Sequence, residues 1–330
     1  MLERYIRQTL FPGIGEEGQK KLGGSRVVII GCGALGTVIA TTLVRAGVGH
    51  VRIIDRDFIE YHNLQRQVLF DEDDVRDKIP KAIAAERHLK KINSSIEIEG
   101  IVADLNMTNI GRFAHDADLI LDGLDNFETR FLINDFALKN KIPWVYGGAV
   151  SSSGMTMNII PGETACFRCL TNTVPNPEAI LTCDTAGVVG PAPFVIGSLE
   201  AAEALKILVK AKEANRDLIY VDVWKSSFQH LKISPRQDCP ACHGEYEFLE
   251  GRFRMRTVIL CGQNSVQLLN AANREISFEE LAKRLRPIEA SYNDFMLSFT
   301  ADDHEIVIFP YGRAIIKNTT DESIAKGLYA

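Results

Sequence analysis

The sequence predicts an α/β protein with a Rossmann-like, doubly wound, mostly parallel sheet, because one stretch near the N-terminus shows three features in order. The apolar run of residues 27–30 is typical of a short buried strand, and a turn with the pattern Gly-x-Gly-x-x-Gly follows at residues 31–36. A helical pattern over residues 37–46 then leads to a second strand, residues 51–54, which ends on Asp55. An acidic residue about 20 positions after such a turn is typical of mononucleotide binding.

The glycine turn predicts a phosphate site. Gly31, Gly33 and Gly36 let the backbone turn tightly and approach a phosphate group. The N-terminus of the following helix offers unpaired N–H groups and partial positive charge to an anion. Asp55 is placed to accept hydrogen bonds from ribose hydroxyls.

The stretch after this turn favours ATP over NAD. Asp57 leads into Asn63, Arg66 and Gln67, and Lys81 comes soon after. A hydride-transfer enzyme needs an apolar slot for nicotinamide at this level of the fold. These polar and cationic side chains suit a polyphosphate and a developing negative charge instead.

The rest of the first 250 residues continues the alternation of helices and strands. We expect helices at residues 17–22, 82–91, 107–115, 127–140 and 194–212, and strands at residues 95–101, 119–121, 142–146, 155–160, 219–224 and 228–233. The strands after Trp144 are expected to turn antiparallel, because no crossover helix fits between Ser151 and Ile160.

An N-terminal segment that carries Arg4 and Arg7 precedes these elements. A solvated arm is the simple interpretation. Arginines on such an arm can also reach across a dimer and clamp a neighbour's phosphates.

Asp125 and Asn126 follow the predicted strand at residues 119–121. Because the carboxyl ends of the strands in a doubly wound sheet form the ligand crevice, both residues should share a rim with the glycine turn and Asp55. An Asp there can hold Mg²⁺ against phosphate oxygens. The structural alternative is a turn that caps the next helix.

Two Cys-x-x-Cys pairs, Cys166 with Cys169 and Cys239 with Cys242, have the ligand count and local spacing of a tetrahedral zinc site. Such a Cys₄ site would anchor the long segment between the two pairs to the domain. The alternatives are two redox pairs or coincidence. Both pairs lie in turn-rich segments rather than after a thioredoxin-like strand, which favours zinc.

Three cysteines stand outside these pairs. Cys183 lies in a Pro- and Gly-rich linker, residues 174–193, and is either incidental or a nucleophile. Cys32 belongs to the glycine turn and is interpreted as a small residue, and Cys261 as a core residue.

The sequence divides into a domain of residues 1–250 and a small α+β domain of residues 251–330. In the second we expect strands at residues 257–260, 296–300, 305–309 and 313–317 and helices at residues 277–286 and 322–329. It carries no constellation of chemical groups, so a docking or dimer-supporting role is expected.

Composition restricts the kind of protein. The 330 residues, 46% hydrophobic and 24% charged, describe an ordinary globular chain. A net charge of −6 without a basic stripe argues against nucleic acid as a partner. No apolar run approaches a membrane span and the start lacks a signal peptide, so we expect a cytoplasmic protein without a membrane partner. In that compartment its seven cysteines are not expected to form disulfides.

Taken together, residues 4–244 resemble the ubiquitin-activating-enzyme superfamily in its small bacterial form, the ThiF, MoeB and HesA type. The family includes the adenylyltransferases for the sulfur carriers of thiamine and molybdopterin biosynthesis. The motifs that carry the resemblance, in order, are residues 4–8, 31–36, Asp55 with Asp57, 63–67, Lys81, Asp125 with Asn126, the two cysteine pairs and residues 195–201.

The resemblance implies that ATP and Mg²⁺ activate the C-terminal Gly-Gly carboxylate of a small ubiquitin-like carrier protein, giving an acyl-adenylate and pyrophosphate. It also implies a homodimer, in which Arg7 acts on the partner subunit's ATP. The residues implied at the nucleotide and Mg²⁺ are Gly31, Gly33, Ala34, Gly36, Asp55, Asp57, Asn63, Arg66, Gln67, Lys81, Asp125 and Asn126, with Arg66, Lys81 and Asp125 catalytic.

By the same resemblance, Cys183 matches the cysteine that thiamine-type members can join to the carrier through a sulfur bond. Two features depart from the family. No rhodanese-like domain follows residue 251, and Ala34 stands where many relatives carry glycine. Two other functions stay open, an NAD-dependent oxidoreductase and a non-catalytic nucleotide-binding scaffold.

Overall fold

A computed structural model gives the fold of residues 2–175, 183–252, 257–260, 265–268, 276–285, 290–310 and 312–329. The chain divides into two compact units, one of Met1–Asn176 with Val188–Phe253 and one of Pro177–Gly187 with Arg254–Ala330. Each unit holds its own sheet. The domain boundary expected between residues 250 and 251 stays a prediction.

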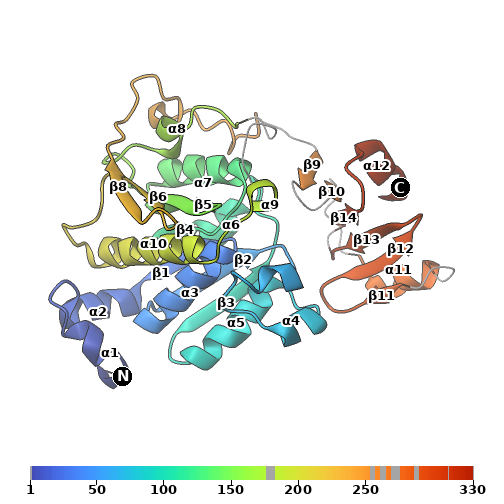
Figure 1. Cartoon of the computed structure of the whole chain (residues 1–330), viewed down its shortest axis with the longest axis horizontal. Helices are drawn as coiled ribbons and strands as arrows, with labels where there is room; N and C mark the ends of the chain where they lie inside the picture. Colours follow the sequence, from blue (N-terminus) through green and yellow to red (C-terminus); the bar gives the residue numbers. More distant parts are fainter. Residues whose placement is uncertain are drawn as a thin grey trace. The chain divides into compact units, whose positions relative to one another are not determined.

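The sheet of the first unit has eight strands and confirms the mixed α/β fold (Figure 1). In spatial order they are β3 (Glu97–Val102), β2 (His50–Asp55), β1 (Arg26–Ile30), β4 (Leu119–Asp122), β5 (Trp144–Val150), β6 (Ser153–Ile159), β7 (Leu218–Asp222) and β8 (Ser227–Leu231). Strands β3 to β5 pair in parallel, and β6 to β8 add antiparallel strands. The antiparallel end predicted after Trp144 is therefore confirmed.

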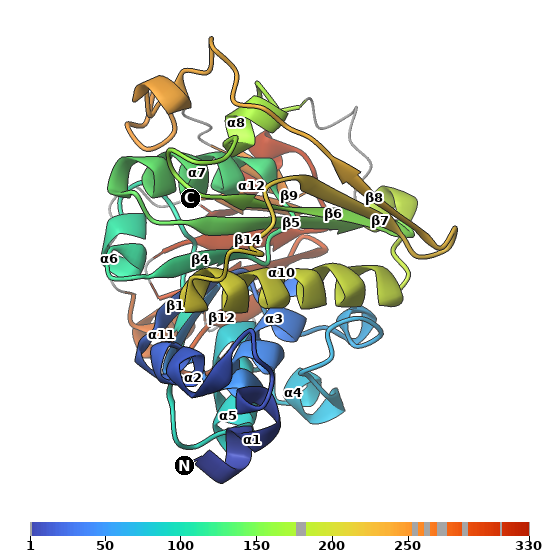
Figure 2. The same cartoon turned by 90° about the vertical axis from the view of Figure 1, so that its left-hand side faces the viewer.

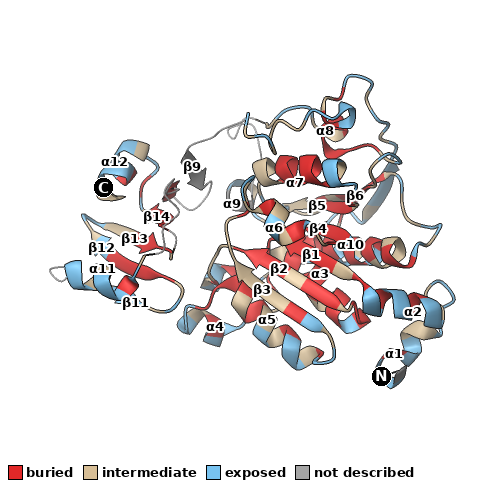
Figure 3. Ribbon diagram, turned by 180° about the vertical axis from the view of Figure 1, so that it is seen from behind, coloured by how far each residue is buried: buried red, intermediate tan, exposed pale blue. Residues whose placement is uncertain are grey.

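Helices cover both faces of this sheet, as Figure 2 shows for α10 and α7. The helices of the unit are α1 (Leu2–Thr9), α2 (Gly15–Gly24), α3 (Ala34–Ala46), α4 (Glu72–Arg76), α5 (Lys81–Ile92), α6 (Ile110–Ala114), α7 (Phe127–Asn140), α8 (Phe167–Leu170) and α10 (Pro191–Val209), with 3₁₀ turns η1 (Tyr61–Asn63) and η3 (Ala241–His243). One core lies beneath α3, α5 and α10, and the other beneath α6, α7 and α8. Figure 3 shows β1 and β4 buried between them, as expected for a parallel sheet covered on both faces.

The order β3-β2-β1-β4-β5 places a topological switch point between β1 and β4. The chain leaves β1 through α3 toward β2, and it enters β4 after α6, which packs in the other core. Ligands of open α/β sheets bind at the carboxyl ends of the strands at such a point. We therefore expect the ligand site at the loops that follow β1, β2 and β4.

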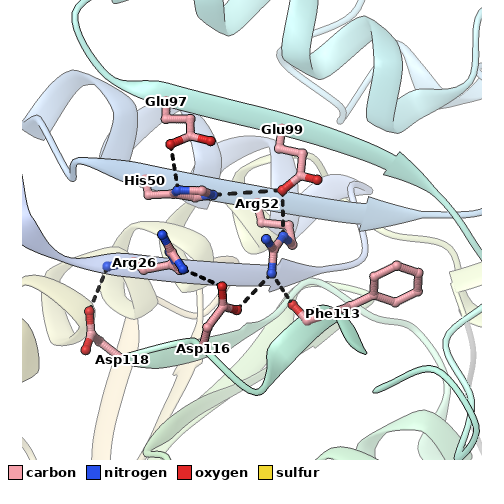
Figure 4. A network of polar contacts seen from close by, with 8 residues as sticks. All are labelled: Arg26, His50, Arg52, Glu97, Glu99, Phe113, Asp116 and Asp118. Atoms are coloured by element: carbon pink, nitrogen blue, oxygen red, sulfur yellow. Dashed lines mark hydrogen bonds and ion pairs between the residues drawn. The ribbon is translucent and has the colours of Figure 1, made fainter. Parts of the chain in front are cut away.

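At the other end of these strands a charged network joins β1, β2 and β3 to the loop before β4 (Figure 4). Arg52 bonds to Glu99 at 2.7 Å and to Asp116 at 2.9 Å, and Arg26 also pairs with Asp116. His50 lies 3.1 Å from Glu97. The two arginines link their carboxylate partners across adjacent strands, so ion pairs as well as backbone hydrogen bonds stabilise this end of the sheet.

Some elements differ from the sequence predictions. The segment with Arg4 and Arg7, for which no helix was predicted, forms the helix α1. Strand β5 continues through two glycines to Val150, and α4 was not anticipated. Tertiary packing decides these cases, because short segments carry too little periodicity to be recognised alone.

The second unit contains a six-stranded antiparallel sheet in the order β11-β12-β13-β14-β10-β9. Its elements are β9 (Thr257–Leu260), β10 (Ser265–Leu268), α11 (Phe278–Arg284), β11 (Ser291–Tyr292), β12 (Leu297–Ala301), β13 (His304–Ile308), β14 (Ala314–Lys317) and α12 (Glu322–Tyr329), and α9 (Cys183–Ala186) also belongs to this unit. The expected strands and helices are present, while β10 and β11 were missed. Cys261 lies outside the described residues.

Within the part of the chain that the structure describes, none of the helices combines the length and the apolar character needed to cross a membrane.

Candidate functional site

The glycine turn between β1 and α3 packs tightly against the start of the β4 loop. Gly31 has a φ of +92°, a conformation that favours glycine, and its N–H donates to the Ile54 carbonyl at 2.8 Å. A Cβ atom on Gly36 would collide with the Gly31 carbonyl oxygen, as would one on Gly123. Gly33 precedes α3 and supplies no side-chain cap. The first N–H groups of α3 therefore have no capping side chain and can serve an anion.

Asp55 at the end of β2 is buried and holds this turn through backbone hydrogen bonds. Its Oδ2 atom accepts from the Cys32 N–H at 2.6 Å, and Oδ1 accepts from the Asp57 N–H at 2.7 Å. Burial raises the pKa of Asp55, while the Lys81 ammonium acts in the opposite direction. Each oxygen keeps a further lone pair, so the carboxylate has capacity for the ribose hydroxyls expected there.

Lys81 lies at the start of α5 beside the same carboxylates. Its Nζ atom is 3.5 Å from Asp57 Oδ2, and its side chain is 10% exposed. Burial alone would lower the pKa of Lys81, but Asp57, Asp55 and Asp125 together raise it. The ammonium group therefore stays protonated at neutral pH, where it can stabilise phosphate oxygens.

Asn63 and Gln67 lie buried in the loop between β2 and α5. Asn63 Oδ1 accepts from the Glu60 N–H at 3.1 Å, so this amide also shapes the η1 turn. Gln67 is 4% exposed, and its Oε1 atom has no hydrogen-bond partner among the described residues. Its Nε2 atom lies 3.9 Å from where a Cβ on Gly33 would stand. A buried amide with unused capacity beside the glycine turn fits a polar ligand.

Arg66 follows on the same loop and is partly exposed. It donates from Nη1 to the His62 carbonyl at 2.7 Å. The guanidinium group keeps other donors, as phosphate binding requires.

The loop after β4 carries Asp125 and Asn126. The side chain of Asn126 accepts from the Thr129 N–H at 3.0 Å and caps α7, so the structural alternative for this residue is confirmed. Asp125 is exposed, and its charge acts on Lys81 and Arg56. An exposed carboxylate among these cations fits a Mg²⁺ ion held mainly by substrate phosphates. A nucleotide contact by Asn126 stays a prediction.

Two groups of charged residues near this rim were missed from the sequence. Arg56 pairs with Asp104 at 2.6 Å. The buried Arg130 pairs with Asp122 at 2.8 Å. Neither pair follows a local motif, because its members come from different elements.

Arg7 lies apart from the residues described so far. The α1 helix docks through Tyr5, which is buried against Gly47, and through Gln8, which donates to the Ala46 carbonyl at 2.8 Å. These contacts are at the C-terminal end of α3, whereas the glycine turn is at its N-terminal end. With 13 residues, α3 is about 20 Å long. Arg7 is exposed and is not brought to the glycine turn of its own chain.

The four paired cysteines form one cluster. The Sγ atoms are separated by 3.8 Å between Cys166 and Cys169, 3.5 Å between Cys166 and Cys239, and 3.6 Å between Cys169 and Cys242. Sulfurs about 2.3 Å from a tetrahedral zinc ion stand about 3.8 Å apart, so the cluster has the right size for zinc. All four are free thiols rather than disulfides. The structure thus brings together the residues expected to bind zinc.

Cys183 is the first residue of α9 in the second unit. Its side chain lies outside the described residues, so its role in sulfur transfer stays a prediction.

Comparison with known proteins assigns the family. The model of the ThiF family matches residues 5–241. The sulfur carrier protein ThiS adenylyltransferase of Bacillus subtilis is 44% identical over 334 residues, covering 100% of this chain and 98% of the relative. The sulfur carrier protein adenylyltransferase of Thermus thermophilus is 38% identical over 250 residues, covering 74% and 92%.

Solved structures share the fold of this chain. Escherichia coli MccB with MccA-N7isoASN superposes with a TM-score of 0.66 at 25% identity, covering 74% of this chain and 75% of that chain. Escherichia coli MccB with ATP gives a TM-score of 0.64 at 26% identity, covering 73% and 74%. With a family model spanning most of its first 241 residues and a relative similar along its whole length, this chain belongs to the ThiF family.

Proposed function

We propose that this protein is an ATP-dependent adenylyltransferase that activates the C-terminal carboxylate of a small ubiquitin-like sulfur carrier protein ending in Gly-Gly. The observation that carries the proposal is the 44% identity, along the full chain, to a ThiS adenylyltransferase. The polar and cationic residues around the glycine turn support ATP, and the relatives give no support to an NAD-dependent oxidoreductase.

The chemistry needs positioned cations rather than a general base. The attacking carboxylate is already ionised, and its approach to the α-phosphate brings negative groups together. The α3 N-terminus and Gln67 would receive the nucleotide at the glycine turn, with Asp55 at the ribose. Lys81 and Arg66 would stabilise the charge that develops on the phosphates. Pyrophosphate leaves as the acyl-adenylate forms.

Metal ions have two separate roles in this proposal. Asp125 would hold Mg²⁺, which neutralises phosphate charge when ATP is bound. Zinc in the cluster of Cys166, Cys169, Cys239 and Cys242 is structural, because four sulfurs leave no open position. A cluster that needs reduced thiols supports a cytoplasmic location.

The partner in catalysis is a second copy of the chain. Arg7 lies at the end of α3 remote from its own glycine turn, which supports a homodimer in which it reaches the partner subunit's ATP. We propose neither nucleic acid nor a membrane as a partner.

The test is exchange of labelled pyrophosphate into ATP. Exchange should require a carrier that ends in Gly-Gly, and Lys81→Ala or Arg66→Ala should reduce it by about 100-fold or more, because each removes a cation from the reacting phosphates. Lys90→Ala is the matched control, since Lys90 lies on the same helix but pairs with Glu86 at the surface. Carrier-independent exchange, or reduction of NAD, would overturn the proposal.

A further inference from the structure

One carboxyl group in the core has no evident structural partner. Glu200 on α10 is fully buried, and neither of its carboxylate oxygens has a hydrogen-bond partner among the described residues. Burial of an ionised, unpaired carboxylate is strongly unfavourable. The Glu200 side chain is therefore expected to be a neutral carboxylic acid or to have a functional role.

An arginine beside Glu200 links the loop after β4 to strand β5. Arg130 donates from Nε to Asp122 Oδ2 at 2.8 Å, and from Nη2 to the Leu124 carbonyl at 2.6 Å and the Gly147 carbonyl at 2.8 Å. Asp122 Oδ1 accepts from the Leu124 N–H at 2.9 Å. One guanidinium group thus anchors the loop that carries Asp125.

Glu200 lies against the same anchor point. A Cβ atom on Gly147 would collide with Glu200 Oε1, so the carboxyl group packs directly on the residue whose carbonyl Arg130 holds. Thr156 is paired with Gly147 across β5 and β6, so both face the α10 side of the sheet. The Thr156 hydroxyl is also buried without a hydrogen-bond partner among the described residues, and it supplies a neutral acceptor on that face.

The charged groups around Glu200 can compensate only one ionised acid, either Asp122 or Glu200. Asp122 on β4, Arg130 on α7 and the Tyr146 phenol on β5 act on this group or on its arginine. On α10 itself, Glu203 is paired with Lys206 at 2.6 Å. Strand β6 has no charged residue, and α3 has only an arginine in its last turn.

Because Asp122 already neutralises Arg130, a second carboxylate would be uncompensated. Burial, followed by the Asp122 charge, raises the pKa of Glu200 well above its usual range, although Arg130 opposes this.

We propose that Glu200 is a positioning residue for adenylation: as a neutral carboxylic acid it leaves Arg130 committed to Asp122, and so keeps the Asp125 loop anchored to β5. Loss of its proton creates a carboxylate that competes with Asp122 for the arginine, and the loop loses its anchor. The role in adenylation rests on the proposed function, whereas the protonation state does not.

The first test concerns the proton and needs no activity. The infrared difference spectrum between wild type and Glu200→Gln at neutral pH should contain the carbonyl band of a protonated carboxylic acid. Carboxylate bands in its place would overturn the proposal. This result stands even if no carrier supports pyrophosphate exchange, so it separates failure of the inference from failure of the proposed function.

The second test is the pH profile of exchange. As pH rises, wild type should lose kcat, with little change in KM for ATP. One pH unit above the midpoint of that loss, Glu200→Gln should retain about tenfold more of its neutral-pH kcat than wild type, since one pH unit changes the ratio of protonated to ionised acid tenfold. Glu203→Gln, the matched buried acid on the same helix, should follow wild type in its profile. Superimposable alkaline limbs for wild type and Glu200→Gln would overturn the proposal.

Discussion

At the scale of single residues, several side chains of the proposed nucleotide site form hydrogen bonds that support the local structure. Asp55 uses both oxygens to hold backbone N–H groups of the glycine turn and the next loop. Asn63 shapes the η1 turn, and Asn126 caps α7. Replacing such a residue changes both the pocket and its support, so tests at this scale need variants that separate the two effects.

A comparison of alanine variants at Gly36 and Gly33 helps to separate them. Gly36→Ala would place a methyl group on the Gly31 carbonyl oxygen, which is backbone and cannot move without the turn. We expect a loss of about 1–3 kcal/mol in the free energy of unfolding, together with loss of ATP binding. Denaturant titration and binding of a fluorescent ATP analogue measure the two effects.

Gly33→Ala is the control for stability, because its new methyl group would lie no closer than 3.9 Å to the nearest atoms. It should keep the stability of wild type. Equal stability of the two variants would contradict the close packing of the turn.

Asp135 gives a pH dependence of stability. It is fully buried on α7, and burial raises its pKa to about 6 although its Oδ2 atom accepts from the Phe248 N–H at 2.9 Å. Because the folded-state pKa exceeds the unfolded value, protonation favours the folded state. Its contribution is complete below the unfolded pKa and is lost as pH rises through about 6.

Asp135→Asn cannot ionise, so it should gain about 1–2 kcal/mol relative to wild type between pH 5 and pH 8. Denaturant titrations of both proteins at the two pH values measure this difference. A constant difference between the proteins would show that Asp135 does not titrate in this range.

At the scale of elements, the cysteine cluster joins two distant segments of the chain at the core beneath α6, α7 and α8. Cys166 precedes α8 and Cys169 lies within it, while Cys239 precedes η3 and Cys242 lies within it. The two pairs are 73 residues apart, measured from Cys166 to Cys239. A metal ion there closes a long loop, which includes β7, β8 and all of α10.

Removal of zinc should therefore destabilise the protein. We expect one zinc ion per chain by elemental analysis, and a loss of about 3 kcal/mol or more in unfolding free energy after chelation or in Cys239→Ser, the scale expected for opening a long cross-linked loop. Cys183→Ser is the control, because this residue belongs to neither Cys-x-x-Cys pair, and this variant should keep its zinc. Unchanged stability after complete metal removal would refute the structural role.

At the scale of the whole molecule, the active assembly is proposed to need two chains. The glycine turn and Lys81 lie at the N-terminal ends of α3 and α5, whereas α1 docks at their C-terminal ends, with Arg4 donating to the Ile92 carbonyl at 2.9 Å. Within a single chain, Arg7 is thus remote from the glycine turn and Lys81, the site on which it is expected to act.

Complementation tests this arrangement. Arg7→Ala and Lys81→Ala homodimers should both be inactive, but co-expression should restore about a quarter of wild-type exchange, because half of a random dimer population carries one intact site. Sedimentation analysis would verify that both variants form dimers. Absence of complementation in verified mixed dimers would assign Arg7 to its own chain.

Much of the fold and the grouping of the four cysteines could be predicted, because the sequence patterns that indicate them are local. The strand, glycine turn, helix and strand of residues 27–55 each follow from short-range periodicity, and the two Cys-x-x-Cys pairs from spacing alone. The α1 helix and strand β10 escaped prediction, since short segments acquire their conformation through packing.

The sequence by itself thus determined the family motifs, the glycine turn, the cationic stretch and the two cysteine pairs, because each is encoded by neighbouring residues. Only the tertiary structure decided which distant groups meet. It joins Asp122, Arg130, Gly147 and Glu200 from four different elements beside the Asp125 loop, and it separates Arg7 from the pocket of its own chain. The physical reason is that electrostatic coupling depends on distance in space, which sheet order and helix packing set.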